Sequence, residues 1–145
     1  ERLNADAHIA LDDQADRLMR DEFDRGIDVV LDFVWGDPAS RALKAATGNR
    51  GSGKGEPRLR YVQLGTMAGD EVAIRGDMLR STGLELIGSG IGSVAIADLL
   101  AGAGELLFAA SAAGFNTPFT SLPLHAVNQA WQDDSKTRYV IVPNN

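Results

Sequence analysis

The chain has 145 residues and no cysteine, which excludes disulfides, thiolate metal sites and cysteine nucleophiles. Histidine is almost as scarce, since only His8 and His125 occur. Neither belongs to a histidine–carboxylate spacing typical of zinc sites. The sequence also has no G-x-S-x-G elbow and no Ser-His-Asp order for a nucleophilic hydrolase. We therefore expect both histidines to be structural or exposed.

Long apolar runs are missing as well, because none approaches the roughly 18 residues that a membrane span needs. The first residues do not have the basic-then-apolar pattern of a signal peptide. Basic residues are outnumbered, with 14 Lys and Arg against 20 Asp and Glu and a net charge of −6. This balance argues against a nucleic-acid surface. We expect a cytoplasmic protein without a membrane or nucleic-acid partner.

What the sequence does contain is an alternation of apolar runs and helical patterns. The expected strands are residues 8–11, 27–34, 59–65 and 84–87, and the expected helices between them are residues 14–26, 37–47 and 77–81. The run 27–34 is nearly continuous in apolar character, as in a strand covered on both faces. Asp37 is predicted to cap the second helix, with Pro38 in its first position. The pattern predicts an α/β fold with a parallel sheet.

The second half of the chain begins with a long apolar stretch, residues 93–113, that has a helical pattern. Gly102 and Gly104 interrupt it, so two consecutive helices are expected. Residues 119–124 are predicted to form an extended edge segment, because it contains Pro123. A short amphipathic helix over residues 124–131 and a last strand over residues 138–142 complete the prediction.

Glycines mark two candidate phosphate-binding turns. Residues 88–93 nearly match G-x-G-x-x-G in a strand–turn–helix context, but they follow a late strand rather than the first one. Pyrophosphate binding and tight strand–helix packing both remain open there. Residues 48–54 match the first seven positions of a phosphate loop, but Gly55 stands where Ser or Thr would hold Mg²⁺. That segment also runs from a helix into a strand, which favours a surface insertion over a nucleoside triphosphate site.

Two carboxylates also stand out in the second predicted strand. Asp28 and Asp32 are four residues apart, flanked by apolar residues, and Asp32 is placed near the carboxyl end of the sheet. Ligands bind at that end in open α/β sheets. The sequence leaves a structural and a functional role equally open for Asp32.

Taken in order, three segments resemble the later nucleotide-domain strands of the medium-chain dehydrogenase/reductase superfamily: residues 26–34, 60–65 and 84–90. The tail is similar to that family's C-terminal signature through residues 122–124, Val127, residues 130–131 and residues 138–143. The superfamily includes zinc-type alcohol dehydrogenases and quinone oxidoreductases. The resemblance implies a Rossmann-type parallel sheet. The family's glycine fingerprint and its catalytic domain with the zinc ligands have no counterpart in this sequence.

The resemblance therefore implies the C-terminal half of such an enzyme, with residues 1–114 as a partial nucleotide-binding domain and residues 115–145 returning to the catalytic domain. The implied reaction transfers hydride between the nicotinamide of NAD or NADP and an alcohol, carbonyl, quinone or enone substrate. The sequence does not distinguish NAD from NADP. We expect the chain to be inactive alone and to bind no zinc, with a small-molecule substrate for the whole enzyme.

Residue by residue, the resemblance implies seven cofactor contacts and no catalytic residue. Phe33 and Val34 would lie beside the ribose and nicotinamide, and Leu64 and Gly65 beside the nicotinamide amide. Gly88 and Ser89 would lie near the nicotinamide, and Arg138 near the pyrophosphate.

If residues 9–11 are the family's third strand, its usual neighbours are missing and two sheet edges are exposed. Exposed edges favour association, so a homodimer or another homo-oligomer is expected. The alternative function is a non-catalytic binding or oligomerisation module, in which the apolar stretch 93–113 and the open edges make subunit contacts.

Overall fold

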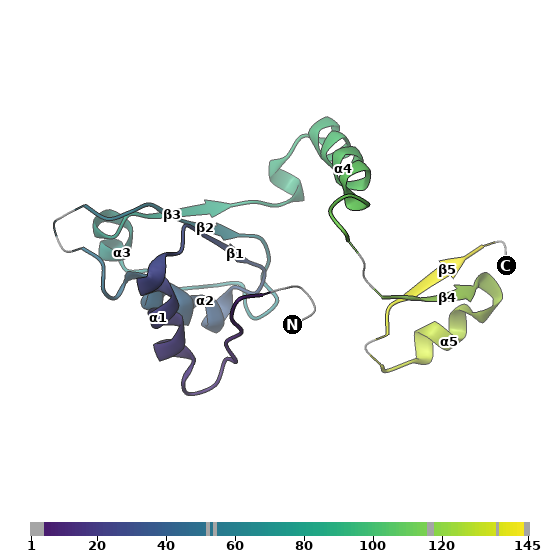
Figure 1. Cartoon of the computed structure of the whole chain (residues 1–145), viewed down its shortest axis with the longest axis horizontal. Helices are drawn as coiled ribbons and strands as arrows, with labels where there is room; N and C mark the ends of the chain where they lie inside the picture. Colours follow the sequence, from purple (N-terminus) through teal and green to yellow (C-terminus); the bar gives the residue numbers. More distant parts are fainter. Residues whose placement is uncertain (1–4, 52, 54, 116–117, 136, 144–145) are drawn as a thin grey trace. The chain divides into compact units, whose positions relative to one another are not determined.

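A computed structural model describes residues 5–51, 53, 55–115, 118–135 and 137–143. It divides the chain into two compact units, Glu1–Ala95 and Ile96–Asn145 (Figure 1). Helices and parallel strands occur in both units. The predicted α/β class with parallel pairing is thus confirmed. The predicted domain boundary after residue 114 stays a prediction.

The first unit is built around a three-stranded parallel sheet with the order β1-β2-β3. Its elements are α1 (Ala15–Gly26), β1 (Val29–Asp32), α2 (Gly36–Thr47), β2 (Leu59–Gln63), α3 (Gly76–Ser81), β3 (Leu84–Gly88) and the 3₁₀ turn η1 (Ile91–Ser93). The expected helices and strands between residues 14 and 87 are confirmed, although β1 and β2 are shorter than expected and β3 extends to Gly88.

The expected strand at residues 8–11 is wrong, because these residues have no regular secondary structure. The apolar run is only three residues long, and Asp12 and Asp13 follow it directly. No described strand lies beside it to supply backbone partners, and Leu11 is exposed. The edges of the sheet are therefore β1 and β3, and β2 lies between them.

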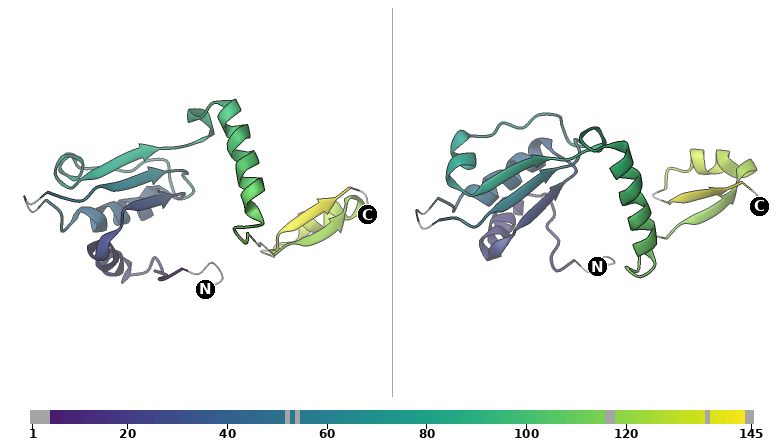
Figure 2. Two further views of the ribbon diagram at one scale, coloured as in Figure 1. Left: turned by 45° about the horizontal axis from the view of Figure 1, so that its top comes forward. Right: turned by 90° about the horizontal axis from the view of Figure 1, so that it is seen from above.

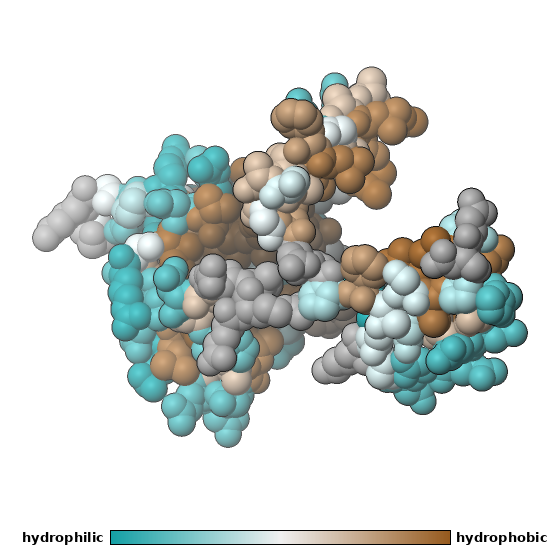
Figure 3. Space-filling view, turned by 45° about the vertical axis from the view of Figure 1, so that its right-hand side comes forward, coloured by the Kyte–Doolittle hydropathy of each residue, from teal (hydrophilic) through white to brown (hydrophobic). Residues whose placement is uncertain are grey.

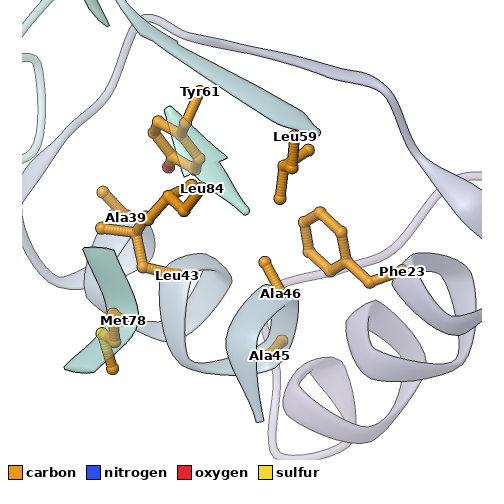
Figure 4. Packing of buried hydrophobic residues seen from close by; sticks show 9 residues of the cluster. All are labelled: Phe23, Ala39, Leu43, Ala45, Ala46, Leu59, Tyr61, Met78 and Leu84. Carbon is orange, nitrogen blue, oxygen red and sulfur yellow. The ribbon is translucent and has the colours of Figure 1, made fainter. Parts of the chain in front are cut away.

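The core of the first unit lies between the sheet and the helices on one of its faces (Figure 2). α2 contributes its small and branched face, and α1 adds Phe23. Figure 4 shows these side chains meeting residues of β2, β3 and α3. The buried cluster comprises Phe23, Ala39, Leu43, Ala45, Ala46, Leu59, Tyr61, Met78 and Leu84.

The opposite face of the sheet is open, so the expectation that residues 27–34 are covered on both faces is wrong. Leu31 is 61% exposed and Ile87 is 41% exposed. The strand register aligns Leu31 with Val62 and Val62 with Ile87, which makes one apolar row across the sheet. Within this unit, no described element covers the second face of this β-branched strand.

The second unit contains α4 (Ile96–Ala110), β4 (Thr120–Pro123), η2 (Leu124–Ala126), α5 (Val127–Gln132) and β5 (Tyr139–Val142). β4 and β5 pair in parallel, with Thr120 opposite Tyr139. The expected edge segment, helix and last strand are confirmed. α4 runs without a break through Gly102 and Gly104, so the prediction of two helices is wrong. No helix among the described residues is long and apolar enough to cross a membrane.

Candidate functional site

The candidate site lies at the carboxyl ends of the three parallel strands of the first sheet. We call this end of the sheet its carboxyl edge, as distinct from the outer strands β1 and β3. The register places Asp32 opposite Gln63 and Gln63 opposite Gly88, so the last residues of β1, β2 and β3 are level. In open α/β sheets, ligands bind outside the carboxyl ends of the strands.

Six of the seven predicted contact residues lie at this edge. Phe33 and Val34 directly follow β1, and Leu64 and Gly65 directly follow β2. Gly88 is the last residue of β3, and Ser89 follows it. Backbone hydrogen bonds tie these segments together. The Asp32 carbonyl accepts from the amide of Leu64 at 2.7 Å, and the Gln63 carbonyl accepts from the amide of Ser89 at 2.9 Å. Sequence reasoning therefore found positions that the fold brings side by side.

Arg138 belongs to the second unit, where it directly precedes β5. Its carbonyl accepts a hydrogen bond from the amide of Thr120 at 2.9 Å. Its predicted contact with a pyrophosphate stays a prediction.

Asp32 is 5% exposed, and its carboxylate is hydrogen-bonded within the first unit. Oδ1 accepts hydrogen bonds from the amides of Val34 at 2.8 Å and Trp35 at 3.0 Å. Oδ2 accepts from the hydroxyl of Tyr61 at 2.9 Å. The carboxylate thus organises the turn after β1, and the role left open by the sequence is structural. Asp28 precedes β1 and is exposed.

Tyr61 is the buried partner of this carboxylate, on the middle strand. Burial, the hydrogen bond to Asp32 and the negative charge of Asp32 together raise the pKa of the Tyr61 phenol well above its ordinary value of 10.0. The phenol therefore remains a hydrogen-bond donor to Asp32 at neutral and moderately alkaline pH.

This shift predicts a loss of stability at high pH. Above about pH 10 the unfolded phenol releases its proton whereas the folded phenol keeps it, so the free energy of unfolding falls as the pH rises. This contribution has a slope of about −1.4 kcal/mol per pH unit. Tyr61→Phe removes it, and urea denaturation from about pH 9 to about pH 11 should show a shallower decline than in the wild type. Equal slopes in the two proteins would contradict the raised pKa of Tyr61.

The turn between β1 and α2 is closely packed against the segment after β2. α2 begins at Gly36 with Trp35 as its N-cap residue, so the expectation that Asp37 caps the helix and Pro38 opens it is wrong. Gly36 has φ +59°, and a Cβ there would lie 2.6 Å from the carbonyl oxygen of Ala68. The Val34 carbonyl accepts from the amide of Ala68 at 2.7 Å. Because these segments nearly touch, only glycine fits at residue 36.

The glycines among the predicted contacts differ in the space around them. A Cβ on Gly65 would lie 2.6 Å from the carbonyl oxygen of Phe33, so this glycine allows a close backbone approach. A Cβ on Gly88 would meet nothing within 4 Å. Substitutions at Gly88 therefore probe the site without disturbing the fold, whereas those at Gly65 change the packing itself.

A pocket of about 470 Å³ opens at this edge of the sheet. Its volume lies within the range of about 300–1,000 Å³ that is usual for small-molecule sites. Its lining combines an indole, aliphatic side chains and polar groups from Trp35, Gln63, Thr66, Asp70, Leu86, Ile87 and Gly88. Of these residues, only Gly88 was predicted from the sequence. Thr66 and Asp70 lie in a glycine-containing loop, and no motif there marks them as site residues. For Trp35, the only feature in the sequence that could indicate a site is its position after a predicted strand.

The second glycine-rich segment lies away from this edge, after the C-terminus of α2, as expected for a surface insertion. Ser52 and Lys54 fall outside the described residues. The amide of Gly51 donates to Oε1 of Glu56 at 2.8 Å, so one backbone amide of this loop is already hydrogen-bonded to a carboxylate of the chain. That this segment does not bind a nucleotide stays a prediction.

Both histidines are exposed, and no role in a site follows from their surroundings. Among the residues described, no group of three or more histidine, cysteine or acidic side chains could hold a metal ion. The expectation that this chain binds no zinc stays a prediction.

A comparison with models of known protein families found no match for this chain. A comparison with curated proteins found no match either.

Proposed function

We propose that this chain is the C-terminal part of an NAD(P)-dependent oxidoreductase with a Rossmann-type sheet. The whole enzyme would transfer hydride between a nicotinamide and an alcohol, carbonyl, quinone or enone. The observation that carries the proposal is the common edge of β1, β2 and β3. Six residues assigned to cofactor contact by the family resemblance, drawn from three separate segments, lie there together.

The edge has chemistry suited to a nicotinamide ring. Phe33 and Val34 present exposed apolar side chains after β1, and the neighbouring pocket adds a few polar groups. Ligand sites commonly combine apolar walls with a small number of orienting polar groups. When bound, the cofactor supplies the hydride chemistry, and this chain's residues bind and orient the ring. Groups that polarise the substrate are expected from outside these 145 residues, so the chain alone should be inactive.

The proposal predicts saturable binding of NADPH or NADH to the purified chain, measured as a change in the fluorescence of the reduced nicotinamide. Gly88→Phe should weaken binding about tenfold or more, because the ring fills pocket space that is open beside Gly88. Gly88→Ala is the matched control and should leave the affinity within about twofold, since it adds only one methyl group.

Absence of saturable binding to the wild-type chain would contradict the proposed function. Equal affinities of the phenylalanine and alanine variants would show that the nucleotide binds elsewhere than at this edge.

A second candidate function is a non-catalytic assembly module, favoured by the apolar surfaces of both units. The row of Leu31, Val62 and Ile87 crosses the open face of the first sheet. In the second unit, apolar side chains gather over α4 (Figure 3). α4 has only two charged residues, Asp98 and Glu105, and its leucines and Phe108 are exposed. Large exposed apolar patches mark interaction sites.

For this candidate we expect a homodimer at micromolar concentration in sedimentation velocity experiments. Leu31→Lys should shift the population toward monomer, because it places a charge in the apolar row. Leu79→Lys, at an exposed position on α3, is the control and should leave the mass unchanged. A monomeric wild type would contradict the module.

A further inference from the structure

Trp35 has a backbone conformation that a tryptophan rarely adopts. Its φ is 54° and its ψ is −154°. Among the residues that the structure describes, it alone has a positive φ without being glycine. Such a conformation costs roughly 1–3 kcal/mol and persists only where the surroundings determine it. Strained residues of this kind cluster at ligand sites.

The surroundings of Trp35 do determine it. Its amide donates to the buried carboxylate of Asp32 at 3.0 Å. On its C-terminal side, Gly36 packs against the backbone of Ala68. The turn is thus fixed on both sides of Trp35, and its partly buried side chain also packs against the core cluster of the first unit.

The indole so fixed is only half-buried, and it forms one wall of the pocket at the carboxyl edge of the sheet. Leu86, Ile87 and Gly88 contribute aliphatic surface to the same pocket, and Gln63, Thr66 and Asp70 contribute polar atoms. An aromatic ring offers a flat surface on which another planar ring stacks favourably. Glycine alone would relieve the backbone strain at this position, but it has no side chain, so the strain is retained together with an indole that lines the pocket.

We propose that Trp35 contacts the ligand by stacking its indole on a planar ring in this pocket. The inference rests on the proposed function, which supplies two planar rings: the nicotinamide of the cofactor and a quinone substrate. It adds a contact residue that the family resemblance did not assign.

The test uses the whole chain with Trp131→Phe, which leaves Trp35 as the only tryptophan. Trp131 is 86% exposed, so its replacement should not disturb folding. The probes are NADPH, reduced nicotinamide mononucleotide and a naphthoquinone. Each probe that enters the pocket should quench the Trp35 emission saturably. Quenching by the mononucleotide identifies the nicotinamide as the stacking ring, and quenching by the quinone alone identifies the substrate.

Two substitutions in the Trp131→Phe chain separate stacking from packing, with affinity measured from the fluorescence of the reduced nicotinamide or by calorimetry. Trp35→Phe keeps an aromatic ring and should retain affinity within about threefold. Trp35→Leu keeps an apolar side chain without a ring and should lose about tenfold. Circular dichroism and urea midpoints show whether each variant is folded. If the leucine variant is unfolded, the quenching of Trp35 in the Trp131→Phe chain decides whether Trp35 contacts the ligand.

The outcomes separate the two proposals. A parent chain that binds none of the three probes overturns the proposed function and this inference with it. Binding of a probe without quenching of Trp35, or with equal affinity in folded leucine and phenylalanine variants, overturns the role of Trp35 and leaves the proposed function standing.

Discussion

Asp32→Ala is expected to lower the free energy of unfolding by about 3–5 kcal/mol. The substitution removes a buried acceptor and leaves three donors without their partner: the amides of Val34 and Trp35 and the hydroxyl of Tyr61. A buried donor without a partner costs about 1–3 kcal/mol. Urea denaturation monitored by far-ultraviolet circular dichroism measures the change.

Asp28→Ala is the matched control, because it removes the same charge from an exposed position just before β1. It should change the stability by no more than about 0.5 kcal/mol. Similar effects of the two substitutions would show that the Asp32 carboxylate does not organise the turn after β1.

Gly36→Ala is expected to destabilise the chain by about 2–4 kcal/mol. Its new Cβ would lie 2.6 Å from the carbonyl oxygen of Ala68, and the φ of +59° disfavours any residue with a side chain. Relief of the clash requires the segments after β1 and β2 to separate, which opens the edge of the sheet. The midpoint of thermal unfolding should therefore fall by several degrees.

Gly88→Ala provides the comparison for this prediction, because a Cβ there meets nothing within 4 Å. Its effect should stay within about 0.5 kcal/mol. A tolerated Gly36→Ala would mean that the two segments do not approach each other as closely as the structure shows.

The order of strands and helices in the first unit was predictable because its apolar periodicity and its turn residues agree. Gly26 and Gly48 mark the ends of the first two helices in the sequence, and the helices do end there. The parallel pairing followed from the alternation of strands and helices. The level strand ends then explain why residues recognised from three separate segments lie at one edge.

The direction of the side chains on β1 was not predictable. Hydrophobicity alone would bury Leu31 and expose Asp32, yet Leu31 is on the open face and Asp32 is inside. The inversion depends on Tyr61, 29 residues away, and on the backbone of the following turn. A local pattern does not show a satisfied carboxylate whose partners come from another strand.

Two other errors have local causes. A run of three apolar residues at 9–11 is too short to form a strand without a neighbour to pair with. Gly102 and Gly104 each cost a helix about 1 kcal/mol, but leucine, alanine and glutamate around them are strong helix formers. The strain at Trp35 had no signal at all, since tryptophan carries no preference for positive φ.

The most direct test of the central claim is a ¹H–¹⁵N NMR titration of the chain with NADPH. Binding of the nicotinamide should shift amide resonances at the carboxyl edge of the first sheet, with Trp35, Gly65 and Ser89 among the residues affected most. Shifts confined to the glycine-rich segment at residues 48–55, or no shifts at millimolar NADPH, would contradict a nicotinamide site at this edge.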